Sequence, residues 1–385
     1  MSSRSASSRS VACFYVSTAL YWASMYVYVP ILAVHAERLG ASMGLVGTIV
    51  GAYGFAQLLL RIPVGVWSDR IGVRKPFIAA GLASTCIGAL GLGLSSDPHW
   101  LVLWRGMSGA GAAAWVAFTV LFSSYFAPNR IASAMAQISF VSGVAQVICT
   151  YLGGAVAQLW GWHAPFFAGV VLALLGMAAA AMLDEKPLPV RERLTLHEFL
   201  RIGSVPLLLA VSIVTMLSTW AIWVTVQGFT LVYAARLGAG PADLGTLTMV
   251  GYVASTAAYL LSAHLPDRIG VRATVIAAIV TQAVGAFMVP FVQSMPLVAL
   301  SQILGGGGRA LSYPILMSLS IRAVAPSERA TAMGVFQAVY ALGMFAGPAT
   351  AGLLGDLIGL NSVFLVAGLV PLLGIVIVLK AVPSR

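Results

Sequence analysis

Three arginines, Arg61, Arg105 and Arg309, lie inside long apolar runs of this chain. A charged side chain is costly in such surroundings, so each one marks a candidate functional position. Arginine can bind a carboxylate through two parallel hydrogen bonds, which makes it the residue type that suits an anionic ligand. Arg105 and Arg309 lie deepest and are the first candidates for this role. Arg61 lies about two turns from the end of its run, where a long side chain can also extend to the surface.

The composition indicates what surrounds these arginines. The 385 residues are 60% hydrophobic and only 8% charged, and the mean hydropathy is +0.96. So few charges cannot cover the surface of a soluble protein. Apolar runs of roughly 20 residues match one bilayer crossing, and lipid requires each crossing to satisfy its own backbone as a helix. We predict twelve spans, at residues 11–34, 44–66, 77–96, 100–122, 133–158, 164–183, 204–232, 244–265, 274–293, 297–320, 331–356 and 362–380.

The basic residues indicate orientation rather than a nucleic-acid partner. The formal net charge is +10, but most cations lie in short loops on the side of the two termini. Only Arg38 and Arg236 are loop cations on the opposite side. The positive-inside rule then places both termini in the cytoplasm. The sequence therefore predicts an integral, multi-pass protein of a bacterial inner membrane, with the lipid bilayer as a partner and no nucleic acid.

Chemistry that depends on a catalytic, metal or cofactor site has no support in the sequence. Cys13, Cys86 and Cys149 fall inside apolar runs and have no metal-ligand spacing. Gly305–Gly308 lies within an apolar span rather than between a strand and a helix, so it is not a nucleotide loop. We expect no enzyme activity, no catalytic residue, no bound metal and no cofactor.

A six-residue segment occurs twice and reveals a duplication. Asp69-Arg-Ile-Gly-Val-Arg74 is identical to Asp267-Arg-Ile-Gly-Val-Arg272, 198 positions later, and Gly154 matches Gly352 at the same offset. Two parallel six-span repeats should pack about an axis normal to the membrane. The predicted domains are an N-terminal bundle at 1–183, a linker at 184–203 and a C-terminal bundle at 204–385. Thr195–Glu198 has the pattern of a capping box that opens a short amphipathic helix, and a plain solvated linker is the alternative.

These residues resemble the major facilitator superfamily. The first copy matches or nearly matches the signature of its loop between helices 2 and 3, with Trp67 in place of a leucine; the second has Ala263 in place of the first glycine. Arg105 and the small residues after it resemble the family's fourth-helix pattern. Gly343–Pro348 resembles an element that lies in helix 5 of drug antiporters, but here it lies in helix 11. The resemblance implies an all-α membrane protein with twelve transmembrane helices in two pseudo-symmetric six-helix bundles.

The resemblance also implies a cytoplasmic gate in the repeated segment. Asp69 would accept hydrogen bonds from the N-terminus of helix 11, whose partial positive charge favours a carboxylate. Gly65 would let two backbones approach closely. Such contacts form in one conformer only and therefore bias its population. The alternative is that the arginines only enforce topology. The predicted gate consists of Gly65, Asp69, Arg70, Arg74, Asp267, Arg268 and Arg272.

Polar and aromatic side chains of the spans complete the predicted substrate site. Packing in the core or in the interfacial belt is the alternative role for any single aromatic residue. In addition to Arg105 and Arg309, the predicted substrate-binding residues are Trp22, Tyr26, Gln146, Trp223, Gln227, Gln337 and Tyr340.

The acidic residues narrow the expected cargo. All of them, from Glu37 to Asp356, fall in loops or at span ends. Proton-coupled drug antiport and cation export both need a buried carboxylate, and no residue has that position. We therefore expect a monomeric secondary transporter of a small organic solute, with an anion favoured. Exchange of anions, a substrate carboxyl group, or Glu37 or Asp356 could provide coupling. The alternatives are a proton-coupled efflux pump for drugs or metabolites and a non-transporting receptor or lipid-handling protein.

We predict that Asp69→Asn leaves expression intact but impairs transport, because a neutral amide accepts hydrogen bonds from a helix N-terminus less strongly than a carboxylate does. The measurement is flux per molecule of purified protein in liposomes. Wild-type flux in this variant would contradict the gating role.

Overall fold

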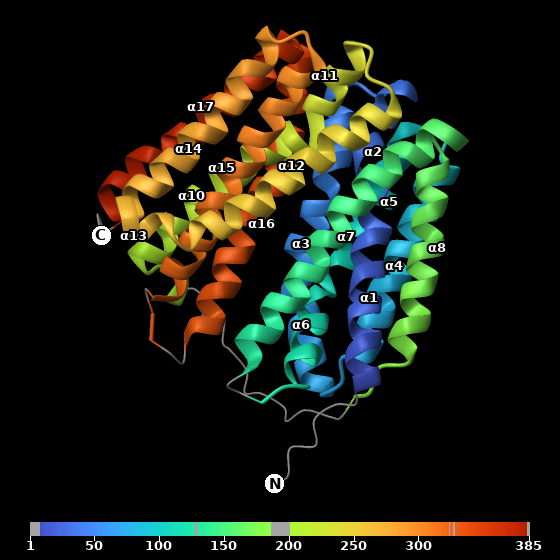
Figure 1. Cartoon of the computed structure of the whole chain (residues 1–385), viewed down its shortest axis with the longest axis vertical. Coiled ribbons are helices and arrows are strands. Elements are labelled where there is room, and N and C mark those ends of the chain that lie inside the picture. Colours follow the sequence, from blue (N-terminus) through green and yellow to red (C-terminus); the bar gives the residue numbers. More distant parts are fainter. Residues whose placement is uncertain (1–7, 128–129, 186–200, 323, 326–327, 383–385) are drawn as a thin grey trace.

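The computed structural model describes residues 8–127, 130–185, 201–322, 324–325 and 328–382. The regular elements of this part of the chain are helices (Figure 1). Their bounds are α1 (Ser8–Tyr26), α2 (Val29–Arg38), α3 (Met43–Ile71), α4 (Lys75–Leu94), α5 (Pro98–Ala113), α6 (Trp115–Ser123), α7 (Ile131–Trp160), α8 (Ala164–Ala181), α10 (Pro206–Val224), η2 (Thr225–Phe229), α11 (Thr230–Arg236), α12 (Pro241–Ser262), α13 (Leu265–Ile269), α14 (Val271–Met288), η3 (Val289–Phe291), α15 (Met295–Arg322), α16 (Arg329–Ile358) and α17 (Leu360–Ala381).

Eleven helical segments of the described chain are long and apolar enough to cross a bilayer. The remaining predicted span, the tenth at 297–320, corresponds to α15, whose four glycines and Arg309 lower its hydropathy. Those glycines let α15 pack closely on its neighbours: a Cβ at Gly306 would lie 2.7 Å from the Gly251 carbonyl oxygen, and one at Gly308 would lie 2.6 Å from that of Ala278. The predicted all-α membrane fold is confirmed, while the predicted linker helix at 195–198 falls outside the described residues.

Two interruptions at matched positions shape the centre of the fold. The first span breaks at Val27 and Tyr28, between α1 and α2, where Pro30 lies at the start of the new helix. The seventh span contains the π-helical turn η2, Thr225–Phe229, which begins 198 residues after Val27. Proline disrupts helical hydrogen bonding, and single π turns often occur at functional sites. Both interruptions lie within membrane spans. Because each one breaks the regular helical repeat, it changes the direction in which the neighbouring buried side chains point.

The two bundles meet at the side away from the chain termini, which we call the distal side. Figure 1 shows α2 and α11 close to each other there, and the ribbons of the two halves diverging toward the N-terminal end. Glycines on one face of α3 allow α16 to approach: a Cβ at Gly51 would lie 2.7 Å from the carbonyl oxygen of Phe345, and one at Gly54 would lie 2.6 Å from the Cβ of Met344. Each would require a shift of the partner, so this interface depends on glycine.

A second distal interface, between α7 and α12, mirrors the first. A Cβ at Gly154 of α7 would lie 2.7 Å from the Cα of Gly245 on α12. Gly154 and Gly245 lie 198 positions from Gly352 and Gly47, which occupy the α3–α16 interface. The duplicated sequence thus produces two related close contacts between the bundles.

Polar contacts reinforce this distal closure. Asp356, near the end of α16, accepts hydrogen bonds of 2.8 Å from the backbone N–H groups of Met43 and Gly44. These are the first residues of α3, where an N–H group has no partner in its own helix and the helix dipole favours a carboxylate. A second link between the halves is the ion pair of Glu37 with Arg236, at 2.6 Å. Both links hold the distal ends of the bundles together.

The first repeated segment is bonded within its own half on the opposite, terminal side. Asp69 pairs with Arg74 at 2.5 Å rather than with helix α16. Glu185 accepts hydrogen bonds from the backbone N–H groups of Arg74 and Lys75, and Lys75 donates through Nζ to the carbonyl oxygens of Ala181 and Leu183. These bonds cap the start of α4 and the end of α8.

The second copy differs from the first. Arg272 matches Arg74 in sequence, but whereas Arg74 pairs with Asp69, Arg272 donates through Nε to the Val382 carbonyl oxygen after α17. The helix is broken before the motif because Pro266 replaces Ser68, and Asp267 and Arg268 lie exposed on the short α13.

The surroundings of Gly65 do not show the close backbone approach that the sequence predicts there. A Cβ there would meet only Val116 Cγ1, at an ordinary 3.7 Å. The close backbone approaches of α3 lie nearer its distal end, at Gly51 and Gly54, because in this conformer the halves touch on the distal side.

We predict that Asp356→Ala shifts the protein toward a conformer that is open on the distal side. The variant loses two hydrogen bonds to a charged acceptor, about 1.5–3 kcal/mol each. Distance distributions between spin labels on the distal ends of α2 and α11, in a variant without native cysteines, should lengthen.

The matched control is Asp97→Ala. Asp97 is another distal aspartate that caps the start of a helix, but that helix is α5 of its own half, whose His99 N–H donates to it. An unchanged distribution in Asp356→Ala, or an equal change in both variants, would contradict the closing role of Asp356.

Candidate functional site

Arg105 of α5 is the centre of a cluster of aromatic side chains in the distal half of the membrane. Its side chain is buried, and the guanidinium carbon lies 4.5 Å from the centre of the Tyr53 ring and 5.8 Å from that of Tyr28. Nε and Nη1 have no hydrogen-bond partner. Ring faces stabilise a guanidinium group but leave its in-plane N–H donors free.

This cluster extends across the boundary between the bundles. Tyr53 of α3 stacks on Trp223 of α10, with ring centres 5.6 Å apart. Tyr26 of α1 makes an edge contact with Tyr252 of α12, also at 5.6 Å. Gln227, in the π turn, donates to the Tyr252 hydroxyl at 2.6 Å. The two interrupted spans therefore supply several of its members. We call Arg105, Tyr26, Tyr28, Tyr53, Trp223, Gln227 and Tyr252 the distal cluster.

A second group lies closer to the terminal side. Arg61 of α3 donates from Nη1 to the Tyr340 hydroxyl of α16 at 3.0 Å, and Gln57 Oε1 is 3.3 Å from the same nitrogen. Arg309 of α15 lies over the Tyr313 ring at 4.2 Å, and the rings of Tyr313 and Tyr340 are 5.9 Å apart. We call Arg61, Arg309, Tyr313 and Tyr340 the terminal-side cluster.

The electrostatics of both clusters share one feature. The Nε atoms of Arg61 and Arg309 are buried without a partner, as is Nε of Arg105. The four ion pairs of the described residues lie at span ends and include none of these arginines. Described His, Cys, Asp and Glu residues form no group of three that could hold a metal ion. The chemistry available at the centre is thus donation of hydrogen bonds from cations to an anion, with aromatic faces beside them.

The structure brings together most of the side chains predicted for substrate binding. Arg105, Tyr26, Trp223 and Gln227 fall in the distal cluster, and Arg309 and Tyr340 fall in the terminal-side cluster. Trp22 adjoins Tyr26, with ring centres 5.7 Å apart. No hydrogen bond or ion pair in the described part of the chain ties the side chain of Gln146 of α7 or of Gln337 of α16 to either cluster.

Sequence reasoning missed Tyr53 and Tyr313 and left Arg61 out of the site. Helical spacing was the available signal. Tyr53, Gln57 and Arg61 recur every four residues on one face of α3, and Tyr313 follows Arg309 at the same interval. The contact of Arg61 with Tyr340 of the other bundle, however, depends on tertiary packing.

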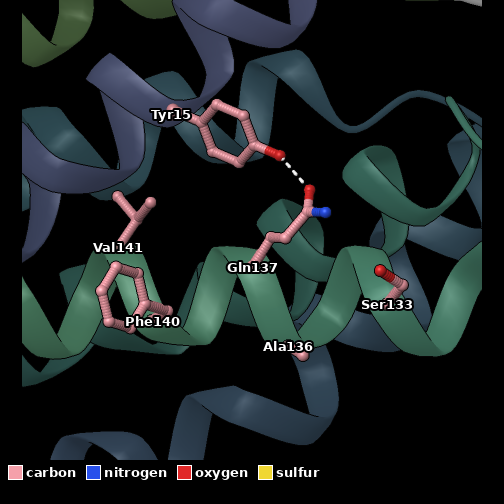
Figure 2. Close-up of a pocket in the computed structure, with 6 residues that line it drawn as sticks. All are labelled: Tyr15, Ser133, Ala136, Gln137, Phe140 and Val141. Carbon is pink, nitrogen blue, oxygen red and sulfur yellow. Dashed lines mark hydrogen bonds between the residues drawn. The ribbon is translucent and has the colours of Figure 1, made fainter.

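A pocket of about 420 Å³ lies beside α1 and α7, nearer the terminal side. Figure 2 shows Tyr15 of α1 pointing toward Gln137 of α7, whose side-chain oxygen accepts a hydrogen bond from the tyrosine hydroxyl. The other lining residues are Ser133, Ala136, Phe140 and Val141 of α7. No charged side chain lines this pocket, so it lacks the cationic donors that distinguish the arginine clusters.

The sequence profile of the Major Facilitator Superfamily matches residues 14–235 and 208–385. The chain belongs to the major facilitator superfamily. It is therefore a multi-pass membrane transporter by family, and the predicted resemblance is confirmed. An uncharacterized MFS-type transporter of Methanocaldococcus jannaschii is 23% identical over 352 residues, which cover 87% of this chain and 88% of the relative.

Two further comparisons are informative, one with a relative of part of the sequence and one with a protein of the same fold. Inner membrane transport protein YajR of Escherichia coli (strain K12) is 36% identical over 155 residues, but these cover only 40% of this chain and 34% of YajR. A crystal structure of the nucleoside transporter NupG has a TM-score of 0.79 at 13% identity and covers 98% of this chain and 99% of that chain. This likeness shows the shared fold and does not extend to the cargo.

Proposed function

We propose that this protein is a secondary transporter that moves a small organic anion, with a carboxylate-bearing solute favoured, by alternating access. The observation that supports the proposal is the presence of three arginines deep between the bundles, with buried guanidinium nitrogens that lack acceptors. An unpaired buried charge costs several kcal/mol. A bound carboxylate would supply both the missing acceptors and the opposite charge, in the planar geometry that guanidinium groups match.

The placement of the arginines fits the expected transport cycle. Arg105 and Arg61 belong to the first bundle and Arg309 to the second. A solute held between them would contact both bundles at the middle of the membrane, where the axis relating the repeats lies. In the described conformer the distal ends are closed by Asp356 and the glycine contacts, and Asp69 is bonded within its own bundle. We infer that the site opens toward the terminal side in this conformer.

Orientation, coupling and assembly are part of the same proposal. The positive-inside distribution supports cytoplasmic termini in a bacterial inner membrane. Without a carboxylate inside the spans, exchange against a second anion fits the site better than a carboxylate-borne proton does. We propose a monomer, because the two bundles of one chain supply both faces of the site.

The alternative is a pump with broad specificity for drugs or metabolites. The aromatic side chains favour it, because Tyr26, Trp223 and Tyr252 offer apolar surface to amphiphilic molecules. The two functions differ in their dependence on positive charge at the site.

A thermal-shift screen against organic anions, sugars, amino acids and drugs tests the choice, since a ligand that binds the folded state raises the melting temperature. We expect the hits to be organic anions. Hits confined to cationic drugs would refute the anion proposal.

We predict that Arg309→Ala lowers flux of the best anion in liposomes by about tenfold or more, since it removes a charge-assisted contact worth about 1.5–3 kcal/mol. Flux of neutral amphiphiles should fall only slightly. The control is Arg322→Ala, at the exposed end of the same helix. A similar, slight reduction of both fluxes in Arg309→Ala would favour the broad-specificity pump.

A further inference from the structure

We propose that Arg61 and Arg309 form a second anion subsite, so that the preferred cargo carries two acidic groups, one for Arg105 and one for the terminal-side cluster. This inference rests on the proposed anion transport and specifies its substrate class. Arg61 is the residue that would distinguish a dianion from a monoanion.

The surroundings of Arg61 do not account for its charge. Its Nη1 donates to a neutral phenol, Tyr340, and to a neutral amide, Gln57, while Nε has no acceptor. A neutral donor would serve both of these bonds without the cost of burying a cation. Nor does Arg61 direct Nη1 to the protein surface, because this atom donates across the bundle boundary to Tyr340 of α16. An additional negative charge from outside the protein would explain why a cation occupies this position.

Arg309 brings a second cation to the same place. It lies over Tyr313, whose ring meets that of Tyr340, the acceptor of Arg61. Two cations from opposite bundles therefore adjoin one pair of tyrosines, and neither has an acidic partner in the described structure. A carboxylate has two oxygens with several lone pairs and could accept from both guanidinium groups at once. The tyrosine hydroxyls could donate to it as well.

The spacing of the two clusters sets the size of the cargo. Tyr53, beneath Arg105, and Arg61 are eight residues apart on α3, or about 12 Å at 1.5 Å per residue. Long arginine side chains on both sides reduce the gap that a ligand must bridge. The aromatic rings of Tyr26, Trp223 and Tyr252 lie at the distal end and suit a carbon skeleton. These features fit a compact dicarboxylate with a few carbon atoms between its acidic groups.

The decisive experiment compares matched acids on the purified full-length protein in nanodiscs. The probe pairs are butyrate with succinate, pentanoate with glutarate, hexanoate with adipate, and benzoate with terephthalate, each measured by calorimetry. We expect at least one dicarboxylate to bind about tenfold or more tightly than its monocarboxylate partner. Arg61→Gln should lower the affinity for that dicarboxylate to about that of its monocarboxylate partner, so that the preference for two acidic groups is lost.

Two variants control for structural effects. Arg61→Lys keeps the charge and should retain most of the preference for two acidic groups. Tyr340→Phe removes the hydroxyl to which Arg61 donates and should retain most of the preference, because both cations remain. Retained binding of the monocarboxylate and an unchanged melting temperature without ligand would show that Arg61→Gln is folded.

The outcomes separate this inference from the function on which it rests. Equal affinity for both members of every pair, with binding lost in Arg105→Gln, would overturn the second subsite but keep anion transport. Equal loss of both affinities in Arg61→Gln would also overturn it, because Arg61 would then hold the shared carboxylate. Failure of every acid to bind would overturn the anion proposal itself.

Discussion

The cost of holding guanidinium groups in a membrane without acidic partners governs the centre of this protein. Aromatic faces compensate part of it at Arg105 and Arg309, and the Tyr340 hydroxyl does so at Arg61. None of these neutral groups supplies a negative charge. Under the proposed anion transport, a bound anion would supply that charge, and the same field would disfavour binding of a cation. In that proposal, the contact that recognises the solute is also the contact that compensates the buried positive charge.

The two repeats supply matched helix contacts around the candidate site, whereas the arginines of the site lie at positions where the repeats differ in sequence. Gly154 with Gly245, and Gly47 with Gly352, are matched pairs that allow the two distal interfaces. The arginines have no such counterparts. Positions 198 residues away from Arg61, Arg105 and Arg309 hold Tyr259, Ile303 and Gly111. Packing between bundles can use symmetry because each half presents a similar surface, whereas one asymmetric solute needs different side chains on each side.

The two faces of the molecule use a carboxylate at a helix end in different ways. On the distal side Asp356 caps α3 of the other bundle, which holds the halves together. On the terminal side Asp69 pairs with Arg74 of its own bundle. If both carboxylates cap the opposite bundle in turn, closure of one face accompanies release of the other. A carboxylate at a helix start is suited to this use because the bond is strong at contact and is lost entirely when the helices separate.

The sequence by itself determined the membrane class, the approximate spans, the duplication and the deep arginines, because long apolar runs and buried charges are local properties of the chain. It also indicated several of the aromatic residues near those arginines. Tertiary structure alone decided that Asp69 pairs with Arg74 and that Arg61 bonds to Tyr340, 279 positions away. It also decided that no other backbone closely approaches Gly65. Contacts between bundles depend on which conformer is populated and on how two helices distant in sequence align, and no local pattern encodes either.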